Sequence, residues 1–323
     1  MVTRRAFIAG TAGTLAGAGL PFGAAFAADY PTRPIHTVVG FPAGSGADIL
    51  VRWYARKLEE VCGQAVVMDN KPGASGNIAT RYAAHMQPDG YNLLFASNSS
   101  MVGAKYLFKD LQFDADKDFA PIATFAQIGF VLVVSPKSPL KNVAELTAKL
   151  KEKKDNVFGY TNPTGLMSAE LYKQLSGVPA KGISYRTAPD TMRDITDGTL
   201  DFMFMDGTFA AGQIRQGTLK PLAVITPQRV SSLPDVPTMK EAGYDFDFAP
   251  WWAIWAPTGT PQPILDQLEG WFKQIAVMPD TIDFLKTIAT NPQEGGQKET
   301  KARLLSEGKI WEPLVKAAGL VPE

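Results

Sequence analysis

The chain has 323 residues, 45% of them hydrophobic, and its 32 basic and 32 acidic side chains leave no formal net charge. This length is sufficient for two ordinary domains, and the composition is that of a folded chain rather than a disordered one. The charge balance excludes a broad basic surface, so we expect no nucleic-acid partner and no electrostatic attachment to a membrane. Any bound anion has to be held locally.

Residues 1–27 have the pattern of an export signal. Arg4 and Arg5 precede an apolar run rich in Ala and Gly, and 25–27 (Ala-Phe-Ala) places small residues where a signal peptidase cleaves. The pattern predicts a twin-arginine-type signal, with an ordinary secretory signal as the alternative. Both deliver the mature chain, which begins near residue 28, to the periplasm. No later apolar run reaches the roughly 18–20 residues of a membrane-spanning helix.

The residues that usually carry catalysis or bind metals are scarce. Cys62 is the only cysteine, which excludes an internal disulfide and a cysteine-based metal site. His36 and His85 lie within a predicted strand and a predicted helix, without the neighbouring nucleophile that a catalytic triad needs. Nucleotide-binding glycine motifs and a Gly-x-Ser-x-Gly elbow are also absent. We therefore predict a freely diffusing monomer with no catalytic residues, metal or cofactor.

The first third of the mature chain repeats one layout, in which a short β-branched run leads through small residues into a run with helical spacing. In the first copy Ser45-x-x-Asp48 has the form of a capping box, which would satisfy orphan N–H groups at the start of the helix. The free N–H groups and the positive dipole end of the first helical turn make it a candidate anion cradle. The predicted strand, loop and helix of each copy are 35–39, 40–46 and 49–58, then 64–70, 71–76 and 77–86, then 91–96, 97–100 and a helix beginning near 101.

The second half repeats the alternation of strands and helices. The predicted elements are a strand at 128–135, a helix at 143–153, a strand, loop and helix at 157–160, 161–165 and 166–175, the same at 182–185, 186–190 and up to 197, and strands at 200–205 and 219–226. Such alternation predicts an α/β fold with largely parallel sheets, whose ligands bind at the carboxyl ends of the strands. We expect the chain to cross into a second domain near residue 128.

The last section contains an aromatic strand at 251–257, a helix that starts after Thr260-Pro261, and a final helix at 299–317. These elements suit a return to the first domain. The predicted division is therefore 28–128 and 250–323 for the first domain and 129–249 for the second.

Segments spread in order over almost the whole mature chain carry a resemblance to a known family. They are Tyr30-Pro31-x-Arg33-Pro34-Ile35, Phe41-x-Ala43-Gly44-x-Gly46-x-Asp48, Asn70-Lys71-Pro72-Gly73-Ala74-x-Gly76-Asn77, Pro88-Asp89-Gly90-Tyr91, Leu233-Pro234-Asp235-Val236-Pro237-Thr238 and Ala256-Pro257-x-Gly259-Thr260-Pro261. With them the chain resembles the extracytoplasmic solute-binding receptors of the tripartite tricarboxylate transporter family, the Bug receptors. The resemblance implies a two-domain periplasmic-binding-protein (Venus flytrap) fold that closes on a small organic carboxylate, with the subunits of a membrane transporter as partners.

Two departures from the family pattern fall in the second domain. The family usually has a Gly-rich serine loop and a histidine where this chain has Thr161-Asn162-Pro163-Thr164-Gly165-Leu166-Met167. Its usual tyrosine-lysine-glycine is replaced by Tyr185-Arg186-Thr187. Both lie in the half of the pocket that is expected to contact the variable end of the ligand, and they leave its identity open among dicarboxylates, amino acids and aromatic acids.

The candidate ligand-binding residues lie in the loops that follow the strands. In the first domain they are Phe41, Ala43, Gly44, Ser45, Gly46, Asp48, Ala74, Ser75, Gly76, Asn77, Ser97 and Asn98. In the second domain they are Thr161, Asn162, Thr164, Gly165, Arg186, Thr187, Ala188 and Asp206. Alternatively, many of these residues are ordinary turn and capping residues.

Several of these candidates have specific expected roles. The amides of residues 43–46 would donate to a carboxylate, and the Arg186 guanidinium would pair with one in a bidentate manner. Asp48 is either a ligand contact or a helix cap. Asp206 either selects a ligand hydroxyl or ammonium group or caps a helix, and at most one of Trp251 and Trp252 is expected in the pocket wall.

Two other functions remain compatible with the sequence. One is an exported α/β enzyme, a hydrolase or a dinucleotide-dependent enzyme, that uses the same cleft. The other is a component that presents its ligand to a membrane sensor.

Overall fold

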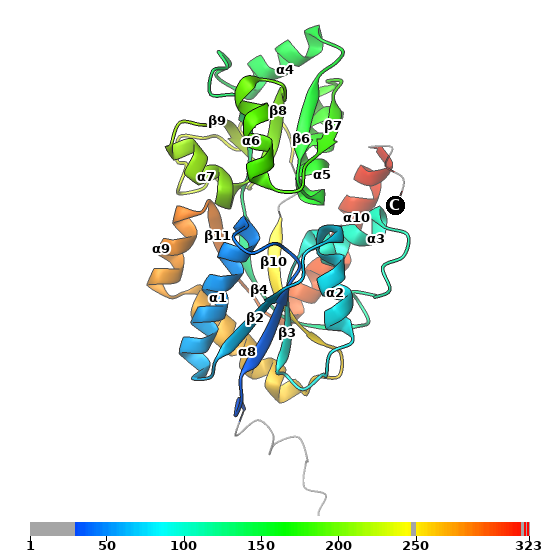
Figure 1. The fold of residues 1–323 in the computed structure, drawn as a ribbon, viewed down its shortest axis with the longest axis vertical. Coiled ribbons are helices and arrows are strands. Elements are labelled where there is room, and N and C mark those ends of the chain that lie inside the picture. Colours follow the sequence, from blue (N-terminus) through cyan, green and yellow to red (C-terminus); the bar gives the residue numbers. More distant parts are fainter. Residues whose placement is uncertain (1–29, 247–249, 318–319, 321, 323) are drawn as a thin grey trace, which may run out of the picture.

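A computed structural model describes residues 30–246, 250–317, 320 and 322, so the predicted signal segment lies outside the described residues. In the described part of the chain, two sheets with helices on their faces form two domains stacked along the long axis of the molecule (Figure 1). The first domain contains a six-stranded sheet and the second a five-stranded sheet. None of the described helices combines the length and the apolar character needed to cross a bilayer.

The strands of the first domain are, in spatial order, β11 (Thr290–Gly295), β4 (Phe119–Ile128), β10 (Trp251–Pro257), β3 (Asn92–Ser97), β1 (Ile35–Val39) and β2 (Val66–Asn70). Its helical segments are α1 (Gly46–Cys62), η1 (Ala74–Gly76), α2 (Asn77–Ala84), η2 (Ser99–Gly103), α3 (Ala104–Leu107), α8 (Gln262–Ala276), α9 (Pro279–Thr287) and α10 (Gln297–Ala317).

The strands of the second domain are, in spatial order, β7 (Lys181–Ser184), β6 (Val157–Tyr160), β8 (Phe202–Asp206), β5 (Phe130–Val134) and β9 (Lys220–Val224). Its helices are α4 (Val143–Glu152), α5 (Pro163–Ser176), α6 (Ala188–Asp197) and α7 (Gly207–Arg215).

Both sheets are mixed, which corrects the prediction of largely parallel sheets. Within the described residues, four of the nine strand pairings are parallel, namely β1 with β2 and β3, and β6 with β7 and β8. The other five are antiparallel. The reason is that β5 and β10 enter their sheets from the interdomain edge. The carboxyl ends of the parallel strands face that edge, so an entering strand has to run the opposite way.

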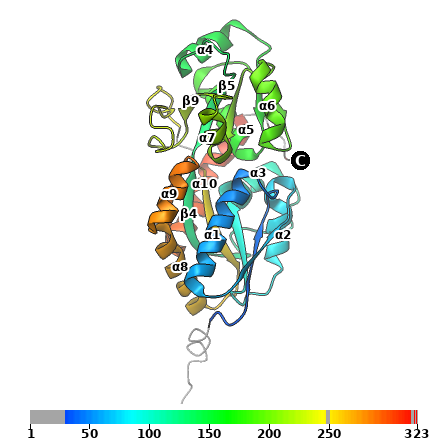
Figure 2. The same cartoon turned by 60° about the vertical axis from the view of Figure 1, so that its left-hand side comes forward.

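The first loop and helix form because the local sequence specifies both ends. The Ser45 hydroxyl accepts a hydrogen bond from the Asp48 amide and caps the start of α1, while Gly63 ends the helix in the left-handed conformation. The inner face of α1 is fully buried at Leu50, Val51, Tyr54 and Leu58. The loop between β1 and α1 is therefore held between a buried strand and a buried helix, at the edge that faces the second domain (Figure 2).

The chain passes between the domains at Gly129, which separates β4 from β5. The Gly129 amide donates to the Ala289 carbonyl, and a Cβ on Gly207 would lie 2.2 Å from the Gly129 carbonyl oxygen. Only glycine permits this approach of two backbones. The domains also meet where α1 contacts α7 and where α10 of the first domain contacts α5 of the second (Figure 1).

Several elements differ from the sequence prediction. Strands β4 and β11 and helix α9 were not predicted, and the strand expected at 128–135 is the end of β4, Gly129 and β5. The helix expected near residue 101 is a five-residue π-helical segment, η2, followed by a single turn, α3.

Candidate ligand-binding site

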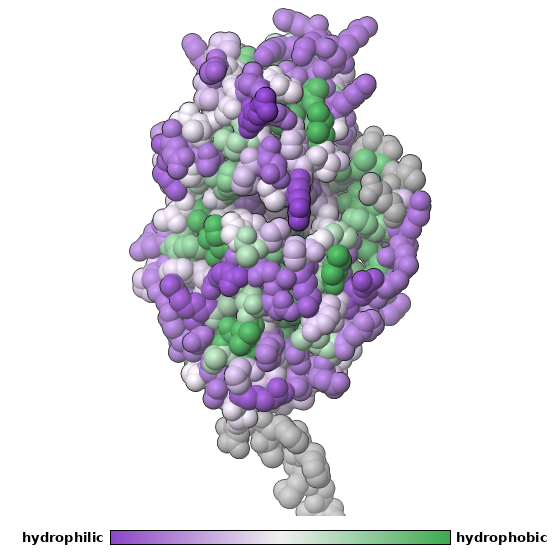
Figure 3. Space-filling model, viewed as in Figure 1, coloured by the Kyte–Doolittle hydropathy of each residue, from purple (hydrophilic) through white to green (hydrophobic). Residues whose placement is uncertain are grey.

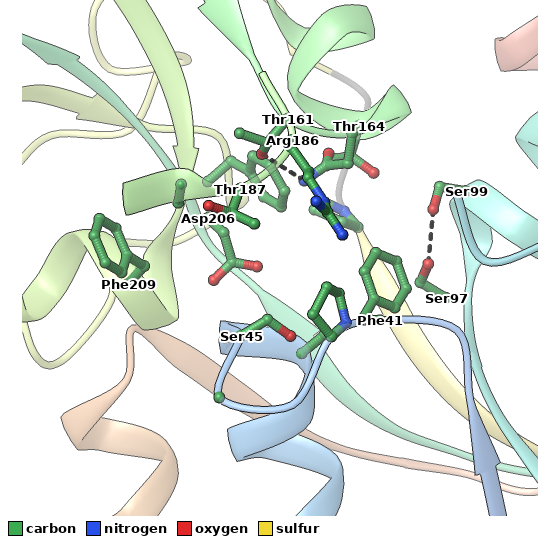
Figure 4. Close-up of a pocket in the computed structure, with 18 of the residues that line it drawn as sticks. Phe41, Ser45, Ser97, Ser99, Thr161, Thr164, Arg186, Thr187, Asp206 and Phe209 are labelled. Carbon is green, nitrogen blue, oxygen red and sulfur yellow. Dashed lines mark hydrogen bonds between the residues drawn. The ribbon is translucent and has the colours of Figure 1, made fainter. Parts of the chain in front are cut away.

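A cavity of about 230 Å³ lies between the two domains, where the carboxyl ends of their parallel strands face each other. The space-filling view shows the recess at this level, and the close-up shows side chains entering it from both domains (Figures 3 and 4). Thirteen of the predicted site residues line it: Phe41, Ala43, Gly44, Ser45, Gly46, Ser97, Thr161, Asn162, Thr164, Arg186, Thr187, Ala188 and Asp206. The volume is below the roughly 300–1,000 Å³ of sites for drug-sized molecules, so a small ligand fits.

The first-domain side of the cavity is built on the start of α1. Among the described residues, the amides of Gly46 and Ala47 have no hydrogen-bond acceptor, and both residues line the cavity. They are the first and second helical residues, so their N–H groups lie at the positive end of the helix dipole. Nearby, the hydroxyls of Ser97 and Ser99 are 2.8 Å apart and both face the cavity (Figure 4). This side offers several donors to an anion.

Asp48 does not line the cavity but holds the loop that does. Its Oδ2 accepts from the Gly44 amide and from Arg52 Nε, both at 2.8 Å, and its Oδ1 accepts from Asn70 Nδ2 at 2.7 Å. Burial alone would raise the pKa of this carboxyl, but the bonds from Arg52, Gly44 and Asn70 keep it below the usual value. The capping-box prediction is thus half confirmed, because the Ser45 cap forms while the carboxylate binds Gly44 instead of the Ser45 amide.

Replacement of Asp48 by Asn tests this function of the carboxylate. Because its pKa is lowered in the folded state, Asp48 stabilises the protein above its unfolded pKa of about 4, and this contribution is lost as the pH falls below that. We expect Asp48→Asn to cost about 1–3 kcal/mol at pH 7 and to weaken the loss of stability on acidification. Urea unfolding at pH 7 and pH 3 measures both effects. The exposed Asp283→Asn variant is the control, and an unchanged pH dependence in Asp48→Asn would contradict the assignment.

The second-domain side is formed by the beginnings of α5, α6 and α7. Asn162 caps α5 by accepting from the Gly165 amide at 2.9 Å, and the Asp190 carboxylate accepts from the Thr187 amide at 2.9 Å at the start of α6. Among the described residues, the amides of Thr164 and Ala188 have no acceptor. In the described chain, four helices therefore direct their amino ends at one cavity. The arrangement favours a negative charge between the domains.

Among the described residues, two charged side chains line the cavity, and they come from the same domain. Arg186 extends from the loop before α6 toward Phe41 (Figure 4). Asp206 ends β8 and caps α7, with its Oδ1 accepting from the Thr208 amide at 2.8 Å. Burial raises the pKa of Asp206, while its hydrogen bonds with Thr208 oppose the rise. The two side chains form no ion pair with each other.

The remaining walls are apolar. Phe41 lies against Trp252 with ring centroids 5.5 Å apart, and Phe130 and Phe209 face them from the second domain. Trp252 is thus in the wall, whereas its neighbour Trp251 is fully buried and does not line the cavity, in agreement with the expectation of at most one. A ligand that touches these rings has an apolar body.

Seven predicted site residues do not line the cavity: Asp48, Ala74, Ser75, Gly76, Asn77, Asn98 and Gly165. The 74–77 turn lies behind the first loop, since a Cβ on Gly40 would be 2.4 Å from the Gly76 Cα. Gly165 packs on the Phe204 carbonyl of β8. Asn77 is buried, and its side-chain amide has no partner among the described residues, as for a group that binds ordered water.

The cavity is also lined by residues outside the candidate list, although Ser99 and Pro189 lie in loops that were expected to contact the ligand: Pro42, Ala47, Ser99, Phe130, Pro189, Phe209 and Pro250. Ala47 adjoins a predicted residue, so including one more residue of that loop would have found it. Phe130 and Pro250 flank the passages between domains, and only the fold brings these passages together. Within the described residues, no group of three or more His, Cys, Asp and Glu side chains is placed to bind a metal ion.

Two domains, a cavity between them and helix amino ends around it define a two-domain solute-binding protein. The family model for the tripartite tricarboxylate transporter family receptor matches residues 50–320. The chain belongs to this family, as its sequence motifs indicated, and is a periplasmic receptor rather than an enzyme.

Individual relatives match this chain over most of its length. A UPF0065 protein of Bordetella bronchiseptica is 33% identical over 302 residues, which are 93% of this chain and 90% of that protein. The structure of R. palustris Rpa4515 with adipate has a TM-score of 0.86 and 29% identity, covering 91% of this chain and all of that one. MatC (Rpa3494) from Rhodopseudomonas palustris with bound malate has a TM-score of 0.79 and 25% identity, covering 88% of this chain and all of that one.

Proposed function

We propose that this receptor captures a small organic carboxylate in the interdomain cavity and delivers it to its membrane transporter. The observation that carries the proposal is the convergence of four helix amino ends, with free amides at Gly46 and Ala47, on one small cavity. Adipate and malate in the related structures are both organic acids, which supports the same chemistry for this ligand.

Capture follows from the position of the donors on two separate domains. A carboxylate that touches both sets of amides binds the closed arrangement more tightly than the open one, so it shifts the population toward the closed form. The closed, loaded form is then the one that the transporter has to recognise.

We further propose that the domains divide at residues 128/129 and 249/250, since β4 ends at Ile128, β5 begins at Phe130 and β10 begins at Trp251. Residues 28–128 and 250–323 would form the first domain. For export we propose the twin-arginine pathway, on the basis of Arg4 and Arg5 before the apolar run.

A thermal-shift screen of the mature chain against a panel of carboxylates tests the function. A ligand present at about 100 times its Kd should stabilise the protein by about 2.7 kcal/mol, and it should be recovered unchanged. Amines and alcohols on the same carbon skeletons are the controls. Failure of every carboxylate to stabilise the protein, or chemical conversion of the one that does, would contradict the proposal.

A further inference from the structure

Arg186 has no partner for its charge within the described residues. Its side chain is exposed, lines the cavity and points toward Phe41 (Figure 4). Other cavity-lining polar side chains have internal roles: Asn162 caps α5, Asp206 caps α7, and the Ser97 and Ser99 hydroxyls bond to each other. In the described part of the chain, no capping bond or ion pair accounts for the Arg186 guanidinium.

Arg186 lies at the amino end of α6, where the Asp190 carboxylate already accepts from the Thr187 amide. It immediately precedes Thr187, the residue before the first turn of α6, so its positive charge lies at the positive end of that helix. The amino end of α5 also faces the same cavity. Asp206 does not neutralise the cation, because its carboxylate accepts from the Thr208 amide and forms no ion pair with Arg186. Among the described residues no carboxylate pairs with Arg186, so its guanidinium is available to an acidic group of a ligand.

The cavity that holds the first-domain donors and Arg186 is also lined by apolar surface. Phe41, Phe130, Phe209 and Trp252 supply aromatic rings to the same cavity. A hydroxylated ligand would place polar groups against these rings, and any hydroxyl left without a partner would weaken binding. The cavity thus fits a ligand with a hydrocarbon chain or ring.

We infer that Arg186 is the specificity-determining residue of the receptor and pairs with a second carboxylate, so that the ligand is a dicarboxylate with an apolar spacer. This inference rests on the proposed function. One carboxylate takes the free amides of Gly46 and Ala47, and the other takes the fork of N–H groups on Arg186 in a bidentate pair. The aromatic rings contact the spacer.

Calorimetry with matched acids tests the inference. The probes are adipate against hexanoate and terephthalate against benzoate, which differ by one carboxylate, and adipate against galactarate, which adds a hydroxyl to each inner carbon. The wild type should bind each diacid at least tenfold more tightly than its monoacid, and adipate more tightly than galactarate. Arg186→Gln should weaken diacid binding about 10- to 100-fold and change monoacid binding less than about threefold. Arg186→Lys keeps the positive charge but lacks the two parallel N–H donors of the guanidinium. Its affinity for diacids should therefore lie between those of the wild type and Arg186→Gln.

Arg193→Gln is the matched control, because Arg193 lies on α6, is exposed and does not line the cavity. Its affinities should equal those of the wild type. Equal binding of diacids and monoacids by the wild type, or an equal loss of both in Arg186→Gln, would overturn the role of Arg186 and leave the receptor function intact. Tighter binding of galactarate than of adipate would overturn the apolar spacer. If none of these acids binds, the inference fails, and the wider carboxylate panel decides whether the proposed function fails with it.

Discussion

A Gly46→Val variant is expected to fold like the wild type and to lose most of its affinity for ligand. Gly46 is the first residue of α1, and a Cβ at this position would lie 2.7 Å from Asp206 Oδ1 and 3.0 Å from Thr208 Cβ of the second domain. A side chain there would hold the domains apart. Inserting atoms into a packed contact costs about 1–3 kcal/mol, which corresponds to roughly 5- to 150-fold weaker binding.

The fold should survive because the conflict is only between the domains. Gly46 has an ordinary helical conformation, so a substituted side chain introduces no backbone strain in α1. Gly212→Ala on α7 is the control, since a Cβ there meets no atom within 4 Å. Calorimetry gives the affinity, and far-ultraviolet circular dichroism with thermal unfolding gives the state of the fold. Wild-type affinity in Gly46→Val would show that ligand binding does not need this interdomain contact.

The sequence was sufficient to place the strand-to-helix loops because each carries its own local signal. Ser45, Asn162 and Thr187 could be recognised as capping residues because each directly precedes a run with helical spacing. All three line the cavity. The same local rule also selected the 74–77 turn, which has every feature of a binding loop. Whether a loop reaches the cavity depends on which strand precedes it. β2 is the edge strand, and its loop lies behind that of β1.

Elements created by tertiary pairing could not be predicted in this way. β11 has the sequence Thr-Asn-Pro-Gln-Glu-Gly, which lacks alternation and contains a proline, yet it pairs with β4 at the edge of the first sheet. The apolar run at 128–135 predicted the passage into the second domain near residue 128, but it has the pattern of one continuous strand and gave no sign that Ile128 ends a strand of the first sheet. The direction of β5 and β10 likewise depends on the path of the chain between the domains rather than on residue pattern.

Glu307 of α10 connects the last helix of the chain to residues that adjoin the cavity lining. Its Oε2 accepts from Asn98 Nδ2 at 3.1 Å, and its Oε1 accepts from the indole N–H of Trp251. Both partners are fully buried. Burial raises the pKa of the Glu307 carboxyl, and the bonds from Asn98 and Trp251 oppose the rise. Ser97 and Ser99 flank Asn98, and Trp252 follows Trp251, so this carboxylate fixes the neighbours of three lining residues.

Replacement of Glu307 by Ala is therefore expected to destabilise the protein by about 2–6 kcal/mol, because two buried donors lose their acceptor at a cost of roughly 1–3 kcal/mol each. Glu307→Gln should lose about 1–3 kcal/mol, since an amide has one oxygen and would direct its own N–H₂ at one of the two donors. Urea unfolding followed by far-ultraviolet circular dichroism measures both changes in the free energy of unfolding.

The control is Glu312→Gln, farther along the same helix, where an exposed carboxylate pairs with Lys316 at 2.7 Å. An exposed pair of this kind contributes at most about 1 kcal/mol, so the variant should be close to the wild type. Because the Glu307 network holds the backbone on either side of Ser97, Ser99 and Trp252, Glu307→Ala should also weaken ligand binding at temperatures where it remains folded. A stability loss in Glu307→Ala no larger than in Glu312→Gln would contradict the assigned network. Unchanged ligand affinity in Glu307→Ala would show that the network does not support the cavity.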